Sequence, residues 1–167
     1  MSSKHFFLAL IYIALGIFLS VLQVSFFPRL GFADISPDLH YILIISLPFT
    51  FPVWLGTIIV ILLGVITDTF MLTSSGLHII GFLCFYYILV YMQQTVYFDH
   101  LLFKAFMAGM AYFILFLVQQ FFLTAHGSMM AAHFHLIPGL GTALATTVFA
   151  IPLLYLLQTL NKGMNIT

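Results

Sequence analysis

The sequence predicts an all-α protein, a polytopic transmembrane helical bundle of about six spans that occupies residues 1–167 as a single domain. Hydrophobic residues make up 63% of the chain, and charged residues only 5%. A soluble domain carries about 25% charged residues because its surface faces water, whereas lipid is itself apolar. Apolar stretches of roughly 20 residues, long enough to cross a hydrocarbon core of about 30 Å, also recur along the chain. Both observations place the protein in the lipid bilayer.

Charge and cysteine content exclude several kinds of partner. The chain has four basic and four acidic residues, whereas nucleic-acid binding needs a basic stripe that faces the phosphates. No nucleic acid is therefore expected. Cys84 is the only cysteine and lies in an apolar run, so neither a disulfide framework nor a thiolate metal cluster is possible.

Polar residues, prolines and glycines divide the chain into candidate spans, at residues 6–27, 37–51, 53–71, 77–96, 103–123 and 140–160. The first of them contains 22 residues. The apolar region of a signal peptide has about 7–15 residues and is followed by a small-residue cleavage site, which is missing here. We therefore expect this stretch to stay in the mature protein as the first span.

The second span is short, with 15 residues and therefore about 22 Å of helix. Its start is well marked, because Ser36 suits an N-cap, Pro37 the first helical position and Asp38 the positive end of the helix dipole. Pro48 and Pro52 bracket its other end and predict a tight bend there. The alternative is a re-entrant hairpin or one long kinked element, with five spans in all.

The basic residues predict the orientation, since they favour the cytoplasmic ends of spans. With six spans and a cytoplasmic N-terminus, Lys4, Lys104 and Lys162 lie inside and Arg29 lies outside. The opposite orientation reverses this distribution. We therefore expect a cytoplasmic N-terminus.

Asp68 is the first candidate for a functional residue, because it lies within the third apolar stretch. An ionisable group at membrane depth costs at least about 2.5–3.5 kcal/mol, so it usually faces the protein interior and has a function. Asp68 is then a buried polar anchor, a ligand contact or a proton-carrying carboxylate. The alternative is a place near the outer end of its helix, where Thr67, Thr69 and water satisfy it.

Two aspartates at the ends of spans are candidates for catalysis. Asp38 and Asp68 lie toward the same face, which raises the question of a carboxylate dyad for acid–base catalysis. The Gly-x-Gly-Asp motif of intramembrane aspartyl proteases does not occur in the chain. The segment with residues 74–76 and His78 does not contain the Gly-x-Ser-Gly motif of intramembrane serine proteases. Residues 74–76 are instead typical of a turn. We expect no enzymatic activity, no catalytic residue and no cofactor.

Histidines and glutamines are the remaining polar groups of interest. His126, His133 and His135 share one outer segment, but no carboxylate or cysteine joins them, so we expect no metal site. Glutamines within or at the ends of the spans, among them Gln23 and Gln119, are expected to form interhelical hydrogen bonds of about 0.6 kcal/mol each.

Five residues form a pattern across three consecutive spans. Pro37 and Asp38 start one span, Gly64 and Asp68 form a Gly-x-x-x-Asp in the next, and Gly76 opens the following helix. With the total length and the small extramembrane mass, this pattern resembles the rod shape-determining membrane protein MreD family. The five residues are therefore the candidates for structural or interaction roles.

The resemblance implies a non-enzymatic component of the bacterial cell-elongation machinery in the inner (cytoplasmic) membrane. Such a protein works with the bitopic protein MreC and, through it, with the actin-like MreB filament, the glycosyltransferase RodA and its transpeptidase. It supports cell wall biogenesis and cell-shape control. The family's fold is similar to the six-helix substrate-binding subunits of energy-coupling-factor vitamin transporters. Capture of a small, vitamin-type molecule is therefore the alternative function.

Overall fold

A computed structural model describes residues 3–30, 35–70, 76–95, 100–125 and 136–163. Within these ranges the regular structure is entirely helical. It consists of six α-helices and one 3-10 helix, which are α1 (Ser3–Ser25), η1 (Pro28–Leu30), α2 (His40–Thr50), α3 (Val53–Phe70), α4 (Leu77–Thr95), α5 (Leu101–Ala125) and α6 (Leu136–Gly163).

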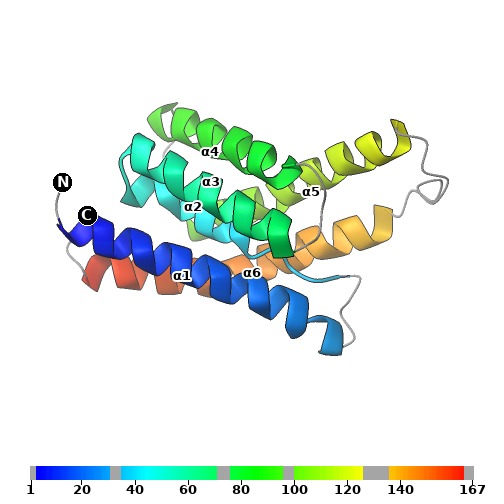
Figure 1. Cartoon of the computed structure of the whole chain (residues 1–167), viewed down its shortest axis with the longest axis horizontal. Coiled ribbons are helices and arrows are strands. Elements are labelled where there is room, and N and C mark those ends of the chain that lie inside the picture. Colours follow the sequence, from blue (N-terminus) through cyan, green and yellow to red (C-terminus); the bar gives the residue numbers. More distant parts are fainter. Residues whose placement is uncertain (1–2, 31–34, 71–75, 96–99, 126–135, 164–167) are drawn as a thin grey trace.

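The helices form one elongated bundle in which α1 begins and α6 ends at the same end (Figure 1). Among the described helices, α1, α3, α4, α5 and α6 are long and apolar enough to cross a membrane. Their outward faces carry large apolar side chains, among them Phe18, Ile80 and Leu144, which are 60–68% exposed. These features confirm the predicted helical bundle of a multi-pass membrane protein.

Helix α2 lies at the centre of this bundle instead of at its lipid surface. It contacts each of the other five α-helices, and nine of its 11 residues are buried. A helix of this length is about 16 Å long, too short to cross a hydrocarbon core of about 30 Å. Residues 37–51 therefore supply a short interior helix and not a full-length span.

The beginning of α2 differs from the prediction. The helix begins at His40, and its N-cap position is Leu39, which forms no side-chain cap bond. The prediction that Ser36 caps the helix and that Pro37 opens it is therefore wrong.

Hydrogen bonds to distant helices explain the later start. Gln23 of α1 donates from Nε2 to the Pro37 carbonyl oxygen at 2.7 Å, and the Asp38 amide donates to Thr146 Oγ1 of α6 at 2.9 Å. The Pro37 carbonyl oxygen is therefore occupied by Gln23 instead of by an amide of α2, and Thr146 satisfies the Asp38 amide, which has no acceptor within a helix that begins here.

The predicted bend lies at the end of α2 but is shorter than the expected residues 47–52, because the helix continues to Thr50. Pro48 is accommodated inside the helix, and the Phe51 amide closes it by donating to the Leu47 carbonyl oxygen at 2.9 Å. The Pro52 carbonyl oxygen then accepts two amides of the first turn of α3, each at 3.0 Å. The turn between the helices therefore consists of Phe51 and Pro52.

Glycines allow the outer helices to approach closely. A Cβ atom at Gly64 of α3 would lie 2.7 Å from the Ile79 Cα atom of α4. A Cβ atom at Gly109 of α5 would lie 2.7 Å from the Ala143 carbonyl oxygen of α6. Both pairs are therefore packed backbone against backbone, as small residues permit in membrane helices.

An uncharged polar network joins the helices near the end at which α1 begins. Asn161 of α6 donates from Nδ2 to Thr50 Oγ1 at 2.8 Å, and Ser46 of α2 donates to Tyr12 Oη of α1 at 3.1 Å. The second, charged network lies toward the opposite end and is the candidate site.

Candidate functional site

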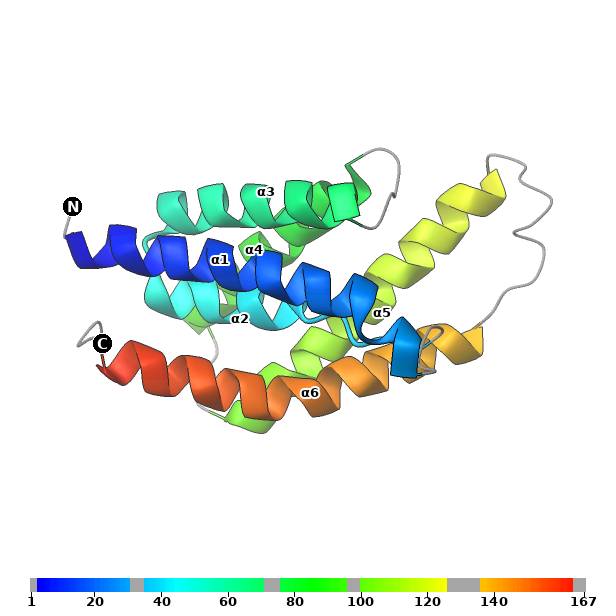
Figure 2. The same ribbon diagram turned by 60° about the horizontal axis from the view of Figure 1, so that its bottom comes forward.

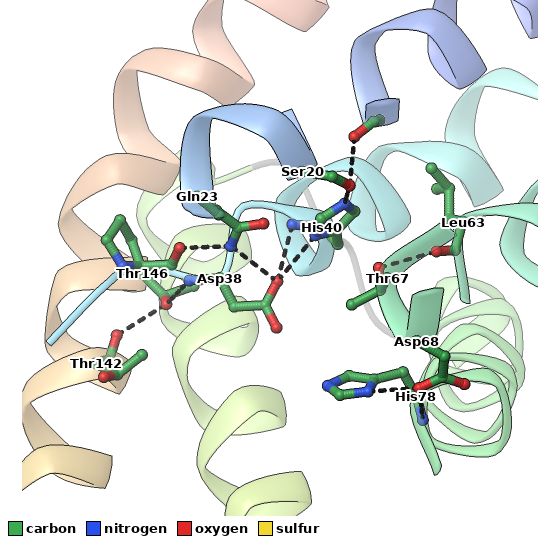
Figure 3. A network of polar contacts seen from close by, with 12 residues as sticks. Ser20, Gln23, Asp38, His40, Leu63, Thr67, Asp68, His78, Thr142 and Thr146 are labelled. Atoms are coloured by element: carbon green, nitrogen blue, oxygen red, sulfur yellow. Dashed lines mark hydrogen bonds and ion pairs between the residues drawn. The ribbon is translucent and has the colours of Figure 1, made fainter. Parts of the chain in front are cut away.

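Polar side chains from all six α-helices meet inside the half of the bundle where α2 begins. Figure 3 shows those of α1, α2, α3, α4 and α6. This polar cluster has two parts. The Asp38 group consists of Ser20, Gln23, Asp38, His40 and Thr146, and the Asp68 group consists of Asp68, His78 and Gln119.

In the Asp38 group, one carboxylate oxygen accepts several hydrogen bonds. Asp38 Oδ1 accepts the His40 backbone N–H at 3.1 Å and faces His40 Nδ1 at 3.3 Å. Gln23 Nε2 lies 3.5 Å from the same oxygen. The side chains of His40 and Asp38 are 0% and 7% exposed, so this contact is buried. A buried carboxylate needs such partners, because its desolvation costs several kcal/mol.

The other nitrogen of His40 faces a hydroxyl group. His40 Nε2 lies 2.9 Å from Ser20 Oγ, and Ser20 Oγ lies 3.0 Å from the Gly16 carbonyl oxygen. Ser20 has a single hydroxyl hydrogen for these two acceptors. If this hydrogen points at Gly16, the ring Nε2–H of His40 donates to Ser20 Oγ. If it points at His40, Nε2 accepts it, so the direction of this hydrogen bond depends on the ring tautomer.

The Asp68 group repeats this arrangement between α3 and α4. Asp68 Oδ1 lies 2.8 Å from His78 Nδ1 and accepts the His78 backbone N–H at 3.3 Å. His78 Nε2 lies 3.4 Å from Gln119 Nε2 of α5. The side chains of His78 and Asp68 are 9% and 12% exposed, slightly more than those of the first pair. Asp68 therefore joins α3 to the first turn of α4.

Two glycines place Asp68 beside His78. Gly64 lies one turn before Asp68 on the same face of α3, where it lets the α4 backbone approach at Ile79. Gly76 has a φ angle of +70°, in the left-handed region that glycine adopts without strain, and its carbonyl oxygen accepts the Ile80 amide at 3.1 Å. The Gly-x-x-x-Asp and the following glycine thus form one structural unit.

Phe82 lies between the two parts of the cluster. Its ring is stacked on the His40 ring at a centroid distance of 6.2 Å and contacts the His78 ring edge-on at 5.8 Å. Phe82 is fully buried. Each aspartate therefore has an imidazole as its immediate neighbour, and the two imidazoles share one aromatic ring.

The order carboxylate, imidazole, hydroxyl in Asp38, His40 and Ser20 is that of a hydrolase triad. A nucleophile also needs room for a substrate and donors for an oxyanion. Ser20 is 1% exposed, and it lies within α1, whose N–H groups are used by the helix itself. The geometry therefore fits a structural hydrogen-bonded chain better than a nucleophile.

The described residues offer few ligands for a metal ion. No three histidine, cysteine, aspartate or glutamate side chains come together there in a way that could hold a metal ion. His126, His133 and His135, for which we predicted no metal site, lie outside the described residues.

All five residues of the sequence pattern contribute to the polar cluster. The Pro37 carbonyl group and Asp38 belong to the first part, and Gly64, Asp68 and Gly76 shape the second. The hydroxyls of Thr67 and Thr69, which were considered as partners of Asp68, donate to carbonyl oxygens of their own helix.

Sequence reasoning did not identify the histidines as the partners of the aspartates. No sequence motif includes His40, and His78 stands out only beside the serine-containing turn at residues 74–76. The available signal was a histidine in the first turn of a helix near an aspartate. That position lets one carboxylate bind both the backbone N–H and the ring Nδ1.

Comparisons with protein-family models, with curated proteins and with solved structures found no match for this chain.

Proposed function

We propose that this protein is a non-enzymatic scaffold of the bacterial cell-elongation machinery, which binds an MreC-like bitopic partner and thereby supports peptidoglycan synthesis and cell shape. One observation carries the proposal. The five residues that resemble the MreD pattern, although they are spread over three segments of the chain, all contribute to one polar cluster. A pattern with a common structural role is a stronger basis for a resemblance than scattered matches.

The chemistry of the cluster also favours a scaffold. Both aspartates are bonded to histidines of the same chain, and both carboxylates cap the first turn of a helix. Polar groups used in this way fix the helices relative to one another. The apolar outer faces are then the surface available to lipid and to other membrane proteins.

The proposed location is the bacterial inner membrane, with the N-terminus in the cytoplasm. The polar cluster then lies in the outer half of the bilayer, and Lys104 lies on the cytoplasmic side. Through the MreC-like protein, the scaffold would act with an MreB-like filament and with a RodA-like glycosyltransferase and its transpeptidase.

The test is co-purification with the MreC-like partner from the native host, combined with cell-shape microscopy. Asp68→Leu removes both the carboxylate that binds His78 and the acceptor for its backbone N–H. We expect this variant to insert but to lose most of its bound partner, and the cells to lose rod shape. Normal rod shape after deletion of the gene would refute the proposal.

A matched control comes from the next residue. Thr69 is exposed, and its hydroxyl donates only within α3, to the Val65 carbonyl oxygen at 2.7 Å. Thr69→Ala should therefore leave partner binding and cell shape unchanged. Asp68→Asn keeps an acceptor for the His78 N–H and should retain more partner than Asp68→Leu.

Capture of a small polar molecule is the second candidate, and one observation favours it. Gln23 Oε1 and Tyr41 Oη are buried and have no hydrogen-bond partner within the described part of the chain. Such groups are available to a bound molecule. Mass spectrometry after gentle purification should then detect a stoichiometric small molecule, and a protein without one would exclude this function.

A further inference from the structure

An apolar groove separates α4 from α5. Among the helix pairs that pack together, α4 and α5 make the least extensive contact, and α5 is inclined to its neighbours (Figure 2). The groove has a volume of about 280 Å³. Its floor includes the buried residues Tyr41, Phe85 and Ala111, and its rim includes the exposed residues Ile88 and Ile114.

The length of the groove matches one leaflet of a bilayer. Along α4 it extends from Leu77, the first residue of the helix, to Ile88. At 1.5 Å per residue this distance is about 16 Å. One leaflet contributes about half of a hydrocarbon core of about 30 Å. The groove therefore begins at the end of the spans and ends near the middle of the bilayer.

The size of the groove selects between the two apolar occupants available in a membrane. A cavity of about 150 Å³ lined by apolar side chains holds one benzene molecule, so a groove of about 280 Å³ holds a hydrocarbon of roughly twice that size. A helix with a diameter of about 10 Å and a length of about 16 Å fills about 1,250 Å³. A transmembrane helix can therefore insert only single side chains, whereas one hydrocarbon chain can lie along the whole groove.

We propose that the groove between α4 and α5 binds one acyl chain of a membrane lipid, from the leaflet at the end of the bundle that holds the polar cluster. The lining of the groove is almost wholly hydrocarbon and aromatic, so the ligand is recognised by shape and not by its headgroup. The chain fills the space between α4 and α5 and lies on Tyr41, whose ring also packs edge-on against Phe82 beneath the polar cluster. The site does not depend on the proposed scaffold function.

The test uses a diazirine-bearing aliphatic amino acid, incorporated either in place of Leu115 inside the groove or in place of Val148. Val148 is 64% exposed on α6 and serves as the control position. The protein is extracted into detergent, purified and then illuminated, so that loosely associated lipid has been removed. We expect phospholipid adducts at position 115 to exceed those at position 148 about tenfold, as a tenfold higher affinity of the groove for lipid would produce.

A second pair of variants tests the groove itself. Ala111→Phe fills the floor and should reduce the lipid adduct at position 115 about tenfold, whereas Val148→Phe adds the same bulk outside the groove and should leave it unchanged. Equal lipid adducts at positions 115 and 148, or detergent adducts alone, would overturn the proposal. An adduct with a second polypeptide at position 115 would also overturn it. If Ala111→Phe does not accumulate, the comparison of the two labelled positions, made with Ala111 intact, decides.

Discussion

The two aspartate–histidine pairs of the polar cluster have the same contacts but different settings. In each pair, one carboxylate oxygen binds both the backbone N–H and the Nδ1 atom of a histidine in the first turn of a helix. Asp38 and His40 are two residues apart, and their side chains are almost completely buried. Asp68 and His78 are ten residues apart, and they connect two helices with a shorter contact of 2.8 Å.

This difference indicates that the two pairs have different structural roles. The two residues of the first pair are neighbours in the chain. Residues of distant helices bind to this pair, namely Ser20 and Gln23 of α1 and Thr146 of α6. It therefore holds the central helix α2 in the bundle. The second pair closes the hairpin of α3 and α4, and its geometry depends on the close approach of these two helices at Gly64. Loss of the first pair should affect the whole bundle, and loss of the second should affect one hairpin.

Removal of the histidines is the strongest test of this comparison. His40→Ala leaves the Asp38 carboxylate buried without its imidazole partner, and breaking a buried pair in this way costs about 3–5 kcal/mol. His78→Ala should cost less, about 1.5–3 kcal/mol, because Asp68 is more exposed. The free energy of unfolding, measured by reversible SDS titration in mixed micelles, gives both values.

A second substitution separates charge from packing. In the His40→Ala background, Asp38→Asn replaces the stranded carboxylate with a neutral amide that still accepts the amide N–H. Part of the lost stability should therefore return. If Asp38→Asn lowers the stability further instead, the Asp38–His40 contact is not the reason for the sensitivity of this site.

The sequence was sufficient to predict those features that depend on composition and on local signals. Apolar length predicted the five long helices, and the two prolines predicted the turn at Phe51 and Pro52. The predicted start of α2 was wrong because it depends on Gln23 of α1, which binds the Pro37 carbonyl oxygen. A local cap signal carries no information about such a partner.

The histidines were missed for a related reason. Pairs two residues apart do not face each other on a helix, so Asp38 and His40 did not suggest a contact. They pair because Asp38 lies before the helix and His40 inside it. The contact between Asp68 and His78 depends on the packing of α3 against α4, which spacing along the chain does not specify.

Gly64→Ala should break only the second pair. The added methyl group would lie 2.7 Å from the Ile79 Cα atom, and backbone cannot rotate away as a side chain does. We expect α3 and α4 to separate locally, at a cost of about 1–3 kcal/mol. Hydrogen exchange should increase at the amides of the first turn of α4 but not at those of α2. Equal increases in both helices would show that the two pairs are not independent.

Gly76→Ala should have the smallest effect and tests the second pair at its backbone. The φ angle of +70° at this position costs an alanine about 1–2 kcal/mol, whereas asparagine adopts this region more readily and also suits an N-cap. A Cβ atom at Gly76 would meet only the end of the Ile79 side chain, at 3.9 Å. The loss of stability therefore comes from the backbone conformation and not from a clash.

Gly76→Asn should accordingly be more stable than Gly76→Ala in the same SDS titration. The first pair has no residue of this kind, since Pro37 and Asp38 are held by α1 and α6. If alanine and asparagine are equally destabilising, steric contact and not the φ angle determines how α4 begins.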